Sequence, residues 1–323
     1  MKKKYLFVVN KDNRFLGSIT DGDIRRSILT GKKLSSLIKD IYNKKAYYVY
    51  QNEIDYKKVS SIVNDNLLNI QAVPVLSKPG KKIVNLITRY NLLKNINIFI
   101  MAGGKGERLN PFSKILPKPL IPIDEKPVID HIIESFSKYG MNNFYVSTNY
   151  KAEIIKAYLN DTKKNLKINY IKEKKPLGTI GSLKFLEKKI KHPIMVTNCD
   201  ILTKIDLVKY YEYHEKNKFD LTCLSCKKNF IIPYGNCKLD KNNNFVKIEE
   251  KPSMEFLINV GLYIINPKII KFIKKNVKTD MNDFINKVKK NGGKIGFYII
   301  KNKDWTDIGE WSKYKQSLNF FKK

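Results

Sequence analysis

The sequence lacks any long apolar run. None of its 323 residues belongs to a stretch near the roughly 18 apolar residues that cross a membrane. Basic residues open the chain at Met1–Lys4, but the apolar run that follows stops before Asn10. A signal-peptide core needs about 7–15 apolar residues and a small-residue cleavage site. We therefore expect a cytoplasmic protein that does not associate with a membrane.

Cysteine is also scarce. Four cysteines are too few for a disulfide scaffold in a chain of this length. Two of them form a CxxC pair within Leu221–Cys226, a strand-like stretch in which side chains at i and i+3 point to opposite faces. No second CxxC or paired His lies nearby to complete a tetrahedral metal site. We expect reduced structural thiols at Cys199, Cys223, Cys226 and Cys237.

Arginine and acidic residues are few beside lysine. The chain has 57 Lys, 5 Arg and 30 acidic residues, with a net charge of +32. Residues 1–95 carry 19 basic and 7 acidic residues, and residues 96–323 carry 43 and 23. This even spread differs from the clustered basic face of a nucleic-acid-binding protein. We expect a solvated lysine surface that attracts anionic substrates and no nucleic-acid partner; tight, salt-sensitive nucleic-acid binding is the alternative.

The single arginine beyond residue 96 stands beside three glycines. The apolar run Ile98–Met101 stops at Gly103 and Gly104, and Gly106 and Arg108 follow. Glycines let backbone N–H groups turn toward one point. Arginine adds a planar, bidentate charge that lysine lacks. The stretch therefore predicts a polyphosphate-binding loop.

The length is sufficient for two domains, and the first 95 residues hold a repeat. Tyr5–Arg26 and Ala72–Leu93 each read as strand, turn, strand, Thr and helix. A shared spacing of this kind indicates a duplicated module. We expect one small α/β domain over residues 1–95 and a second domain over residues 96–323.

The duplicated module resembles a pair of CBS domains, which bind adenosine-type ligands or serve as dimerisation and regulatory modules. The resemblance places Thr20, Asp21 and Asp23 at a nucleotide ribose, whereas the second unit has Arg89 and Asn91 instead. The first unit also lacks the usual leading strand and helix. The resemblance implies an adenine-nucleotide ligand and a homodimer; a purely structural, dimer-forming role is the alternative.

From Asn97 onward, predicted strands alternate with predicted helices. This order implies a Rossmann-like α/β fold with a mixed, mostly parallel sheet covered on both faces. Ligands of such sheets bind at the carboxyl ends of the strands. The expected elements are strands at 98–101, 144–147, 168–171 and 194–197, and helices at 130–139, 152–159 and 182–189.

Further motifs follow the glycine loop in a fixed order. They are Pro117–Pro119, Pro176–Ser182, Val196–Asp200, Glu249–Pro252, Asn259–Gly261 and Trp305–Gly309. This set resembles the signature of the sugar-1-phosphate nucleotidyltransferases, the pyrophosphorylase family, over residues 97–312. The resemblance implies a GT-A-like fold. It also implies a reaction in which a sugar-1-phosphate oxygen attacks the α-phosphorus of a nucleoside triphosphate and pyrophosphate leaves.

Such a reaction joins two anions, so catalysis is mostly charge neutralisation and alignment, without a protein nucleophile. By resemblance, Arg108 holds the triphosphate, Lys118 pairs with oxygens near the α-phosphorus, and Lys251 meets the sugar phosphate. Asp200 and Asp307 are the expected Mg²⁺ ligands, because Mg²⁺ prefers carboxylate and phosphate oxygens. Taken alone, each residue could equally be a cap or a surface charge. The nucleotide-binding residues implied are Ala102, Gly103, Gly104, Gly106, Glu173 and Gly178.

Glu173 lies five residues before Gly178, at a position that faces the nucleobase edge in the family. Guanine presents two donors, N1–H and the N2 amine, which one carboxylate can accept side by side. Uracil and thymine mix a donor with acceptors on that edge, which suits an amide better. Glu173 therefore favours GTP. The alternatives are UTP, dTTP or CTP, or a Glu173 that only pairs with neighbouring lysines.

The sugar contacts implied by the resemblance are Glu250, Asn259 and Gly261, which suit a hexose without selecting one. A CBS pair fused to a guanylyltransferase-like domain resembles the glucosamine-1-phosphate guanylyltransferases of bacterial legionaminic-acid pathways. The expected product is a GDP-sugar for cell-surface glycans, with mannose 1-phosphate as the alternative substrate. A non-catalytic, nucleotide-sensing protein is a further alternative, which the retention of all the predicted phosphate and metal residues opposes.

Overall fold

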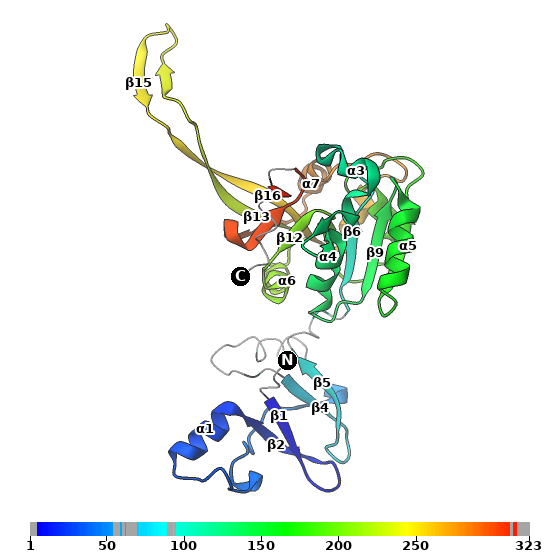
Figure 1. Ribbon diagram of the computed structural model, residues 1–323, viewed down its shortest axis with the longest axis vertical. Coiled ribbons are helices and arrows are strands. Elements are labelled where there is room, and N and C mark those ends of the chain that lie inside the picture. The colour runs from blue at the N-terminus through cyan, green and yellow to red at the C-terminus, as the bar shows by residue number, and fades with distance from the viewer. Residues whose placement is uncertain are drawn as a thin grey trace. The chain divides into compact units, whose positions relative to one another are not determined.

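The computed structural model describes residues 5–53, 59, 62, 70, 72–88, 93, 95–310 and 313–314. It divides into two compact units, Met1–Lys94 and Asn95–Lys323 (Figure 1). Within the described residues, no helix has the length and apolar character needed to cross a bilayer.

In its described residues, the N-terminal unit has two small sheets and one α-helix. β1 pairs antiparallel with β2, and β4 lies between β3 and β5. The backbone N–H of Phe15 donates to Lys81 O at 2.9 Å, which ties the two sheets together. One apolar cluster contains Phe15 and Leu76, and a second contains Val73 and Val75. The elements are β1 (Tyr5–Val9), β2 (Phe15–Thr20), α1 (Asp21–Leu29), β3 (Val49–Tyr50), β4 (Ala72–Leu76) and β5 (Ile83–Thr88).

The residues predicted to contact a ribose begin α1. Asp23 N donates to Thr20 Oγ1 at 3.2 Å, and Thr20 N donates to Asp23 Oδ2 at 2.9 Å, a reciprocal capping box. Arg26 pairs with the other Asp23 oxygen at 2.5 Å. Thr20 and Asp23 thus have a structural role at the helix start. Their counterparts at positions 89 and 91 lie outside the described residues, and the CBS resemblance stays a prediction.

The C-terminal unit is built on a seven-stranded sheet in the order β10-β9-β6-β11-β16-β13-β17. β16 alone runs against the other six, so the sheet is mixed and mostly parallel, as the alternation of elements predicted. The strands are β6 (Asn97–Met101), β9 (Asn143–Thr148), β10 (Lys167–Lys172), β11 (Ile194–Asn198), β13 (Leu221–Ile231), β16 (Ser253–Ile265) and β17 (Ile295–Ile300).

Helices cover both faces of this sheet, because its strands are apolar on both sides. On one face, Phe99, Val196 and Leu221 pack with Phe284 of α7. On the other, Tyr210 of α6 donates from its hydroxyl to Thr222 O at 2.8 Å. The helices are α4 (Val128–Ser137), α5 (Ala152–Thr162), α6 (Leu207–Lys216) and α7 (Met281–Lys290).

One predicted helix differs in type. The stretch expected to be helical at 182–189 forms a short 3₁₀ turn, Gly181–Leu186. Ile180 N, at its start, donates to Thr279 O at 3.1 Å instead of beginning an α-helical ladder. The tertiary contact with the loop before α7 therefore sets the local conformation.

Two strands leave the sheet and form a long arm (Figure 1). Among the described strands, β13 pairs beyond Cys226 with β16 alone. The ribbon continues into a hairpin of β14 (Asn236–Leu239) and β15 (Phe245–Glu249). The sequence prediction contained the strand at Leu221–Cys226 but not the arm. All four cysteines are free thiols, as predicted.

Candidate active site

A cleft of about 640 Å³ opens at the carboxyl ends of β6, β9, β10 and β11. This is the edge at which parallel sheets bind ligands. It is lined by Met101, Gly103, Gly104, Lys105, Gly106, Glu107, Arg108, Lys118, Ser147, Asn149, Glu173, Pro176, Leu177, Gly178, Thr179, Asn198, Cys199, Asp200, Lys278, Asp280 and Gly309.

The glycine loop forms one wall, and each glycine has its own surroundings. Ala102 N donates to Ser147 O at 3.1 Å, which fixes the loop to β9. Gly106 has φ +68°, and a Cβ there would lie 3.0 Å from the Cβ of Lys118. At Gly104 a Cβ would meet nothing within 4 Å, so the backbone there is open to a ligand.

Lys118 and Asp200 form an ion pair in the cleft wall. Their side chains are only 14% and 11% exposed. Burial lowers the pKa of Lys118, but the neighbouring acidic groups, Asp200 above all and Asp307 among them, together outweigh burial and hold the pKa above its ordinary value. The ammonium is therefore charged at any physiological pH.

Asp200 and Asp307 converge on Gly309. A short antiparallel pair, β12 (Ile201–Thr203) with β18 (Trp305–Asp307), aligns the two segments. A Cβ at Gly309 would lie 2.8 Å from Asp307 Oδ1, 3.2 Å from Asp200 Oδ2 and 3.4 Å from Arg108 Nη2. Only glycine lets these three charged groups come so close. The structure thus brings together three residues that the sequence predicted for one site.

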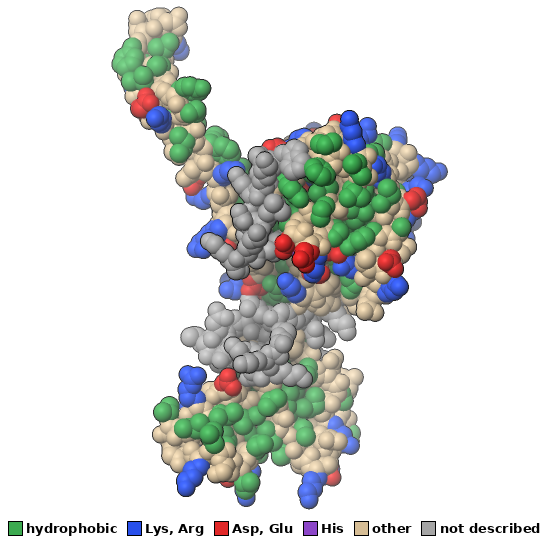
Figure 2. All heavy atoms as spheres, in the orientation of Figure 1, with side chains coloured by type: hydrophobic (Ala, Val, Ile, Leu, Met, Phe, Trp, Pro, Cys, Tyr) green, Lys and Arg blue, Asp and Glu red, His purple; other side chains and the backbone are tan. Residues whose placement is uncertain are grey.

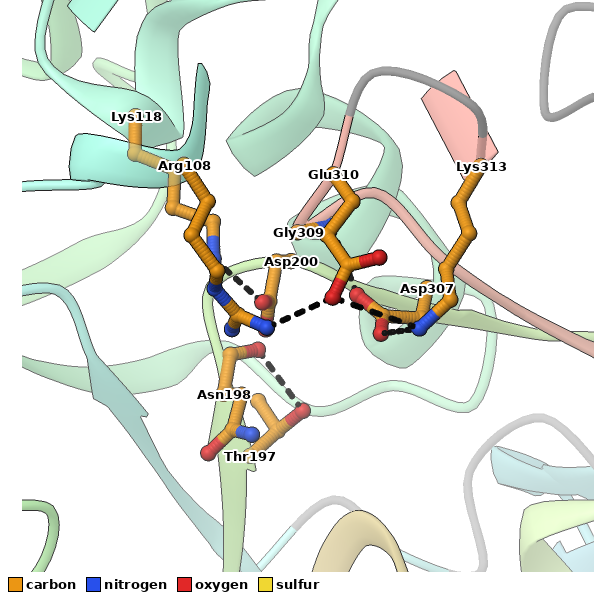
Figure 3. Close-up of polar contacts among 9 residues, drawn as sticks. All are labelled: Arg108, Lys118, Thr197, Asn198, Asp200, Asp307, Gly309, Glu310 and Lys313. Carbon is orange, nitrogen blue, oxygen red and sulfur yellow. Dashed lines mark hydrogen bonds and ion pairs between the residues drawn. The ribbon is translucent and has the colours of Figure 1, made fainter. Parts of the chain in front are cut away.

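Figure 3 shows two further charged residues at this point, which the sequence analysis missed. Glu310 Oε1 accepts from Arg108 Nη1 at 2.8 Å. Lys313 Nζ lies 3.0 Å from Asp307 Oδ2 and 4.0 Å from Glu310 Oε1. In the sequence, the signal that could have identified Glu310 and Lys313 is their position shortly after the Trp305–Gly309 motif.

Glu173 lies inside the cleft and is 5% exposed. Its Oε2 accepts from Leu177 N at 3.0 Å, and a Cβ at Gly103 would lie 3.4 Å from Oε1. Asn149 Nδ2 donates to its backbone oxygen at 2.9 Å. Glu173 forms no ion pair within the described part of the chain, so pairing with its lysine neighbours does not explain its position.

Gly178 packs against the start of α7. It has φ +76°, and a Cβ there would come within 2.5 Å of Thr279 O and 2.7 Å of Asp280 Oδ1. Thr179 N donates to Asp280 Oδ1 at 3.2 Å, and Met281 N donates to Thr179 Oγ1 at 2.7 Å. Asp280 was not predicted from the sequence; it fixes this wall although it lies 101 positions beyond Thr179 in the chain.

Gly261 and Asn259 lie at an irregularity in the β13–β16 ladder. Gly261 has φ +95°, and a Cβ there would lie 2.6 Å from Asn198 Nδ2. Gly261 N donates to Asn259 Oδ1 at 3.2 Å, and Asn259 Nδ2 donates to Tyr263 Oη at 2.7 Å. The predicted sugar-binding residue Gly261 therefore lies directly against Asn198, a residue of the cleft wall.

The structure does not bring Glu250 and Lys251 to the cleft. Both are exposed and lie on the arm, between β15 and β16. Lys251 has φ +47°. No group of three or more His, Cys, Asp or Glu side chains forms a metal site among the described residues.

Residues 97–323 match the Nucleotidyl transferase family. The D-glycero-alpha-D-manno-heptose 1-phosphate guanylyltransferase of Campylobacter jejuni is 34% identical over 188 residues, covering 58% of this chain and 83% of that protein. The mannose-1-phosphate guanyltransferase of Pichia angusta is 34% identical over 185 residues, covering 54% of this chain and 50% of that protein. The chain thus spans about half the length of that second relative.

Solved structures agree in fold. HddC from Yersinia pseudotuberculosis has a TM-score of 0.55 and 27% identity over 70% of this chain and 99% of that chain. A complex of HddC with GMP-PN gives the same TM-score at 28% identity. The family match, the mixed sheet and the charged cleft at its carboxyl edge all place the chain in the nucleotidyl transferase family.

Proposed function

We propose that this protein is a sugar-1-phosphate guanylyltransferase, which joins GTP to a hexose-type sugar 1-phosphate and releases pyrophosphate in the cytoplasm. The observation that carries the proposal is the convergence of Arg108, Asp200 and Asp307 on Gly309, in the cleft that also holds Glu173. The cleft combines charged side chains suited to phosphate with a buried carboxylate, Glu173.

The reaction needs charge and alignment from the protein. An oxygen of the sugar phosphate attacks the α-phosphorus, a new P–O bond forms, and the bond to the β-phosphate oxygen breaks with its electrons leaving on pyrophosphate. Arg108 and the open backbone at Gly104 suit the triphosphate. Lys118, charged and nearly buried, suits the oxygens of the α-phosphorus. Burial raises the pKa of the cleft thiol Cys199 to about 12, so a thiolate nucleophile has no part.

The residues fit a bound Mg²⁺. Asp200 Oδ2 and Asp307 Oδ1 lie 3.2 Å and 2.8 Å from the position that a Cβ of residue 309 would take. The two carboxylate oxygens are therefore at most 6.0 Å apart. Hard carboxylate oxygens completed by substrate phosphates are the usual Mg²⁺ shell. Lys118 and Lys313 neutralise the two carboxylates in this structure. When bound, Mg²⁺ would neutralise the phosphate charge that develops as pyrophosphate leaves.

Glu173 is the proposed guanine contact. Its backbone follows β10, and one carboxylate oxygen is fixed by Leu177 N. A buried carboxylate that points into a cleft attracts two adjacent N–H donors and repels a carbonyl. The guanine of GTP presents two adjacent N–H donors at its base edge, whereas the bases of UTP and dTTP place a carbonyl there.

The sugar is less constrained by the cleft. We propose glucosamine 1-phosphate as the substrate. The alternatives are mannose 1-phosphate, which the names of two relatives support, and the heptose 1-phosphate named in another. Asn259 and Gly261 would contact the sugar from the bulged strand β16. Glu250 and Lys251 would contact the sugar phosphate substrate only if the arm brings them to an active-site cleft. The N-terminal unit is proposed to bind an adenine nucleotide or to support dimerisation.

The test is pyrophosphate release by the full chain with Mg²⁺, measured across the four ribonucleoside triphosphates and dTTP. Each is paired with glucosamine, mannose and heptose 1-phosphates. We expect GTP to exceed every other triphosphate with at least one sugar phosphate. A higher rate with UTP would refute the guanine assignment. Binding of GTP without release of pyrophosphate from any pair would favour a nucleotide-sensing protein instead.

A further inference from the structure

The arm, defined as residues 227–257, exposes many apolar side chains. Figures 1 and 2 show it projecting from the C-terminal unit with hydrophobic side chains along its length. Ten large apolar residues of the arm are between 44% and 74% exposed. They are Phe230, Ile231, Tyr234, Leu239, Phe245, Val246, Ile248, Met254, Phe256 and Leu257.

The ribbon nearest the sheet carries its aromatic side chains on one face. Phe230 is opposite Met254, and Phe256 lies one pair along on the same side. The Phe230 and Phe256 rings are 5.8 Å apart, edge to face. On the other side, Lys227 pairs with Glu255 at 2.8 Å, and Ile231 and Leu257 lie on that side as well.

The distal hairpin separates an apolar pair from polar pairs. Cys237 is opposite Ile248 on one side of the ladder. On the other side, Asn236 is opposite Glu249, and Lys238 is opposite Lys247. A two-stranded hairpin is marginally stable in water by itself and needs a packed face. Nothing else in the C-terminal unit pairs with this hairpin among the described strands.

The exposed apolar area is of interface size. An aromatic side chain presents roughly 150–250 Å² and the six aliphatic or Met side chains present less, so the ten half-exposed side chains on the two faces of the arm together amount to somewhat less than about 1,000 Å². Each partner of a standard protein interface buries about 800 Å². A patch this large on a soluble protein marks an interaction surface.

We propose that the arm packs against the arm of a second copy of this chain, so that the protein is a homodimer joined arm to arm. Charge supports this occupant. The arm carries six lysines and four acidic residues, a net charge of +2 in a chain of +32, and its part beyond Gly235 carries four of each. The lysine-rich bodies repel each other, but such repulsion is screened beyond about 8 Å at physiological salt. An apolar arm of low net charge that projects from the body lets two copies meet where this repulsion is weak. A twofold dimer also matches an apolar face to its own copy.

Cys237 allows a direct test. Of the four cysteines, all within the described residues, only Cys237 is exposed. In the full chain we expect a dimer mass by light scattering, and a covalent dimer when a short bismaleimide is added. Cys237→Ser should remove the cross-link but keep the dimer mass.

The matched variants separate the arm from other contacts. Phe230→Thr with Phe256→Thr should give a folded monomer by light scattering and circular dichroism, and no cross-link. Phe297→Thr, on β17 at 44% exposure, removes a similarly exposed ring outside the arm and should leave the dimer intact. A monomeric wild type would overturn the proposal, because the arm would then cover its own unit or another protein. A wild-type dimer without the Cys237 cross-link, or one that persists in the double variant, would place the contact elsewhere and also overturn it.

Discussion

Arg108 and Glu310 form an ion pair of 2.8 Å beside the cleft, although 202 positions separate them in the chain. The Glu310 carboxylate occupies one side of the guanidinium that is proposed to hold the triphosphate. It therefore stands where a phosphate oxygen would bind, and a polyphosphate must replace it.

We expect Glu310→Gln to bind inorganic tripolyphosphate more tightly than the wild type, by about 2- to 5-fold. A partly exposed pair is worth roughly 0.2–1 kcal/mol, and that cost disappears when the carboxylate is removed. Titration calorimetry measures the affinity. Glu134→Gln is the matched control, because Glu134 is 42% exposed and pairs with Lys126 at 3.0 Å, against 41% for Glu310. Equal or weaker binding by Glu310→Gln would show that Glu310 does not compete with phosphate.

Arg108→Lys should fold normally and lose turnover. The side chain is 66% exposed, so the melting temperature should change little. Lysine cannot give the planar, bidentate contact to a transferring phosphoryl group, and we expect kcat/KM to fall on the order of 100-fold. Steady-state pyrophosphate release gives the value, with Arg14→Lys in the N-terminal unit as the control. Near-normal turnover would remove Arg108 from the phosphate site.

Glu173→Gln should weaken the preference for GTP. Glutamine keeps an oxygen for Leu177 N but replaces the second acceptor with a donor amide, which faces the guanine donors unfavourably. We expect the GTP-to-UTP ratio of kcat/KM to fall at least about 10-fold. The ratio is measured with a single sugar phosphate. An unchanged ratio would mean that Glu173 does not read the base.

His214 should make the protein less stable in mild acid. Burial lowers its pKa to about 4, and Nδ1 lies 2.8 Å from Thr222 Oγ1. Between pH 6.5 and 4 the unfolded chain binds a proton that the folded chain excludes, so stability falls as pH falls through this range, by roughly 2–3 kcal/mol. Urea unfolding from pH 7 to 4.5 should show a flatter profile for His214→Gln than for the wild type. The exposed His192→Gln should follow the wild type; identical slopes for all three would contradict the burial argument.

The sequence was informative where short-range order decides the structure. Strand and helix alternation predicted the mostly parallel sheet, and the glycine loop and the Asp motifs predicted residues that the cleft brings together. Asp280 and Glu310 were missed because their partners, Thr179 and Arg108, lie far along the chain. No local pattern distinguishes such a carboxylate from a surface one.

The arm was also not predicted, because no local sequence pattern indicates it. Its strands alternate like ordinary sheet strands, so the sequence does not indicate that β13 and β16 continue past their neighbours. The positions of Glu250 and Lys251 depend on where the arm lies. Contact of Lys251 with the sugar phosphate and of Glu250 with the sugar therefore stays a prediction, while the residues around Gly309 are held by the β12–β18 pair.

The most direct test of nucleotidyl transfer in this cleft is pyrophosphate release from GTP and sugar 1-phosphate by Asp200→Asn, beside the wild type. Asp200 lies next to Lys118, Asp307 and Gly309, so its charge is central to the proposed phosphate and Mg²⁺ chemistry. The account predicts a loss on the order of 100-fold or more with the fold retained, and no loss for Asp161→Asn, an 80% exposed carboxylate outside the cleft. A rate for Asp200→Asn within about 3-fold of the wild type, roughly 0.7 kcal/mol in activation free energy, would contradict it.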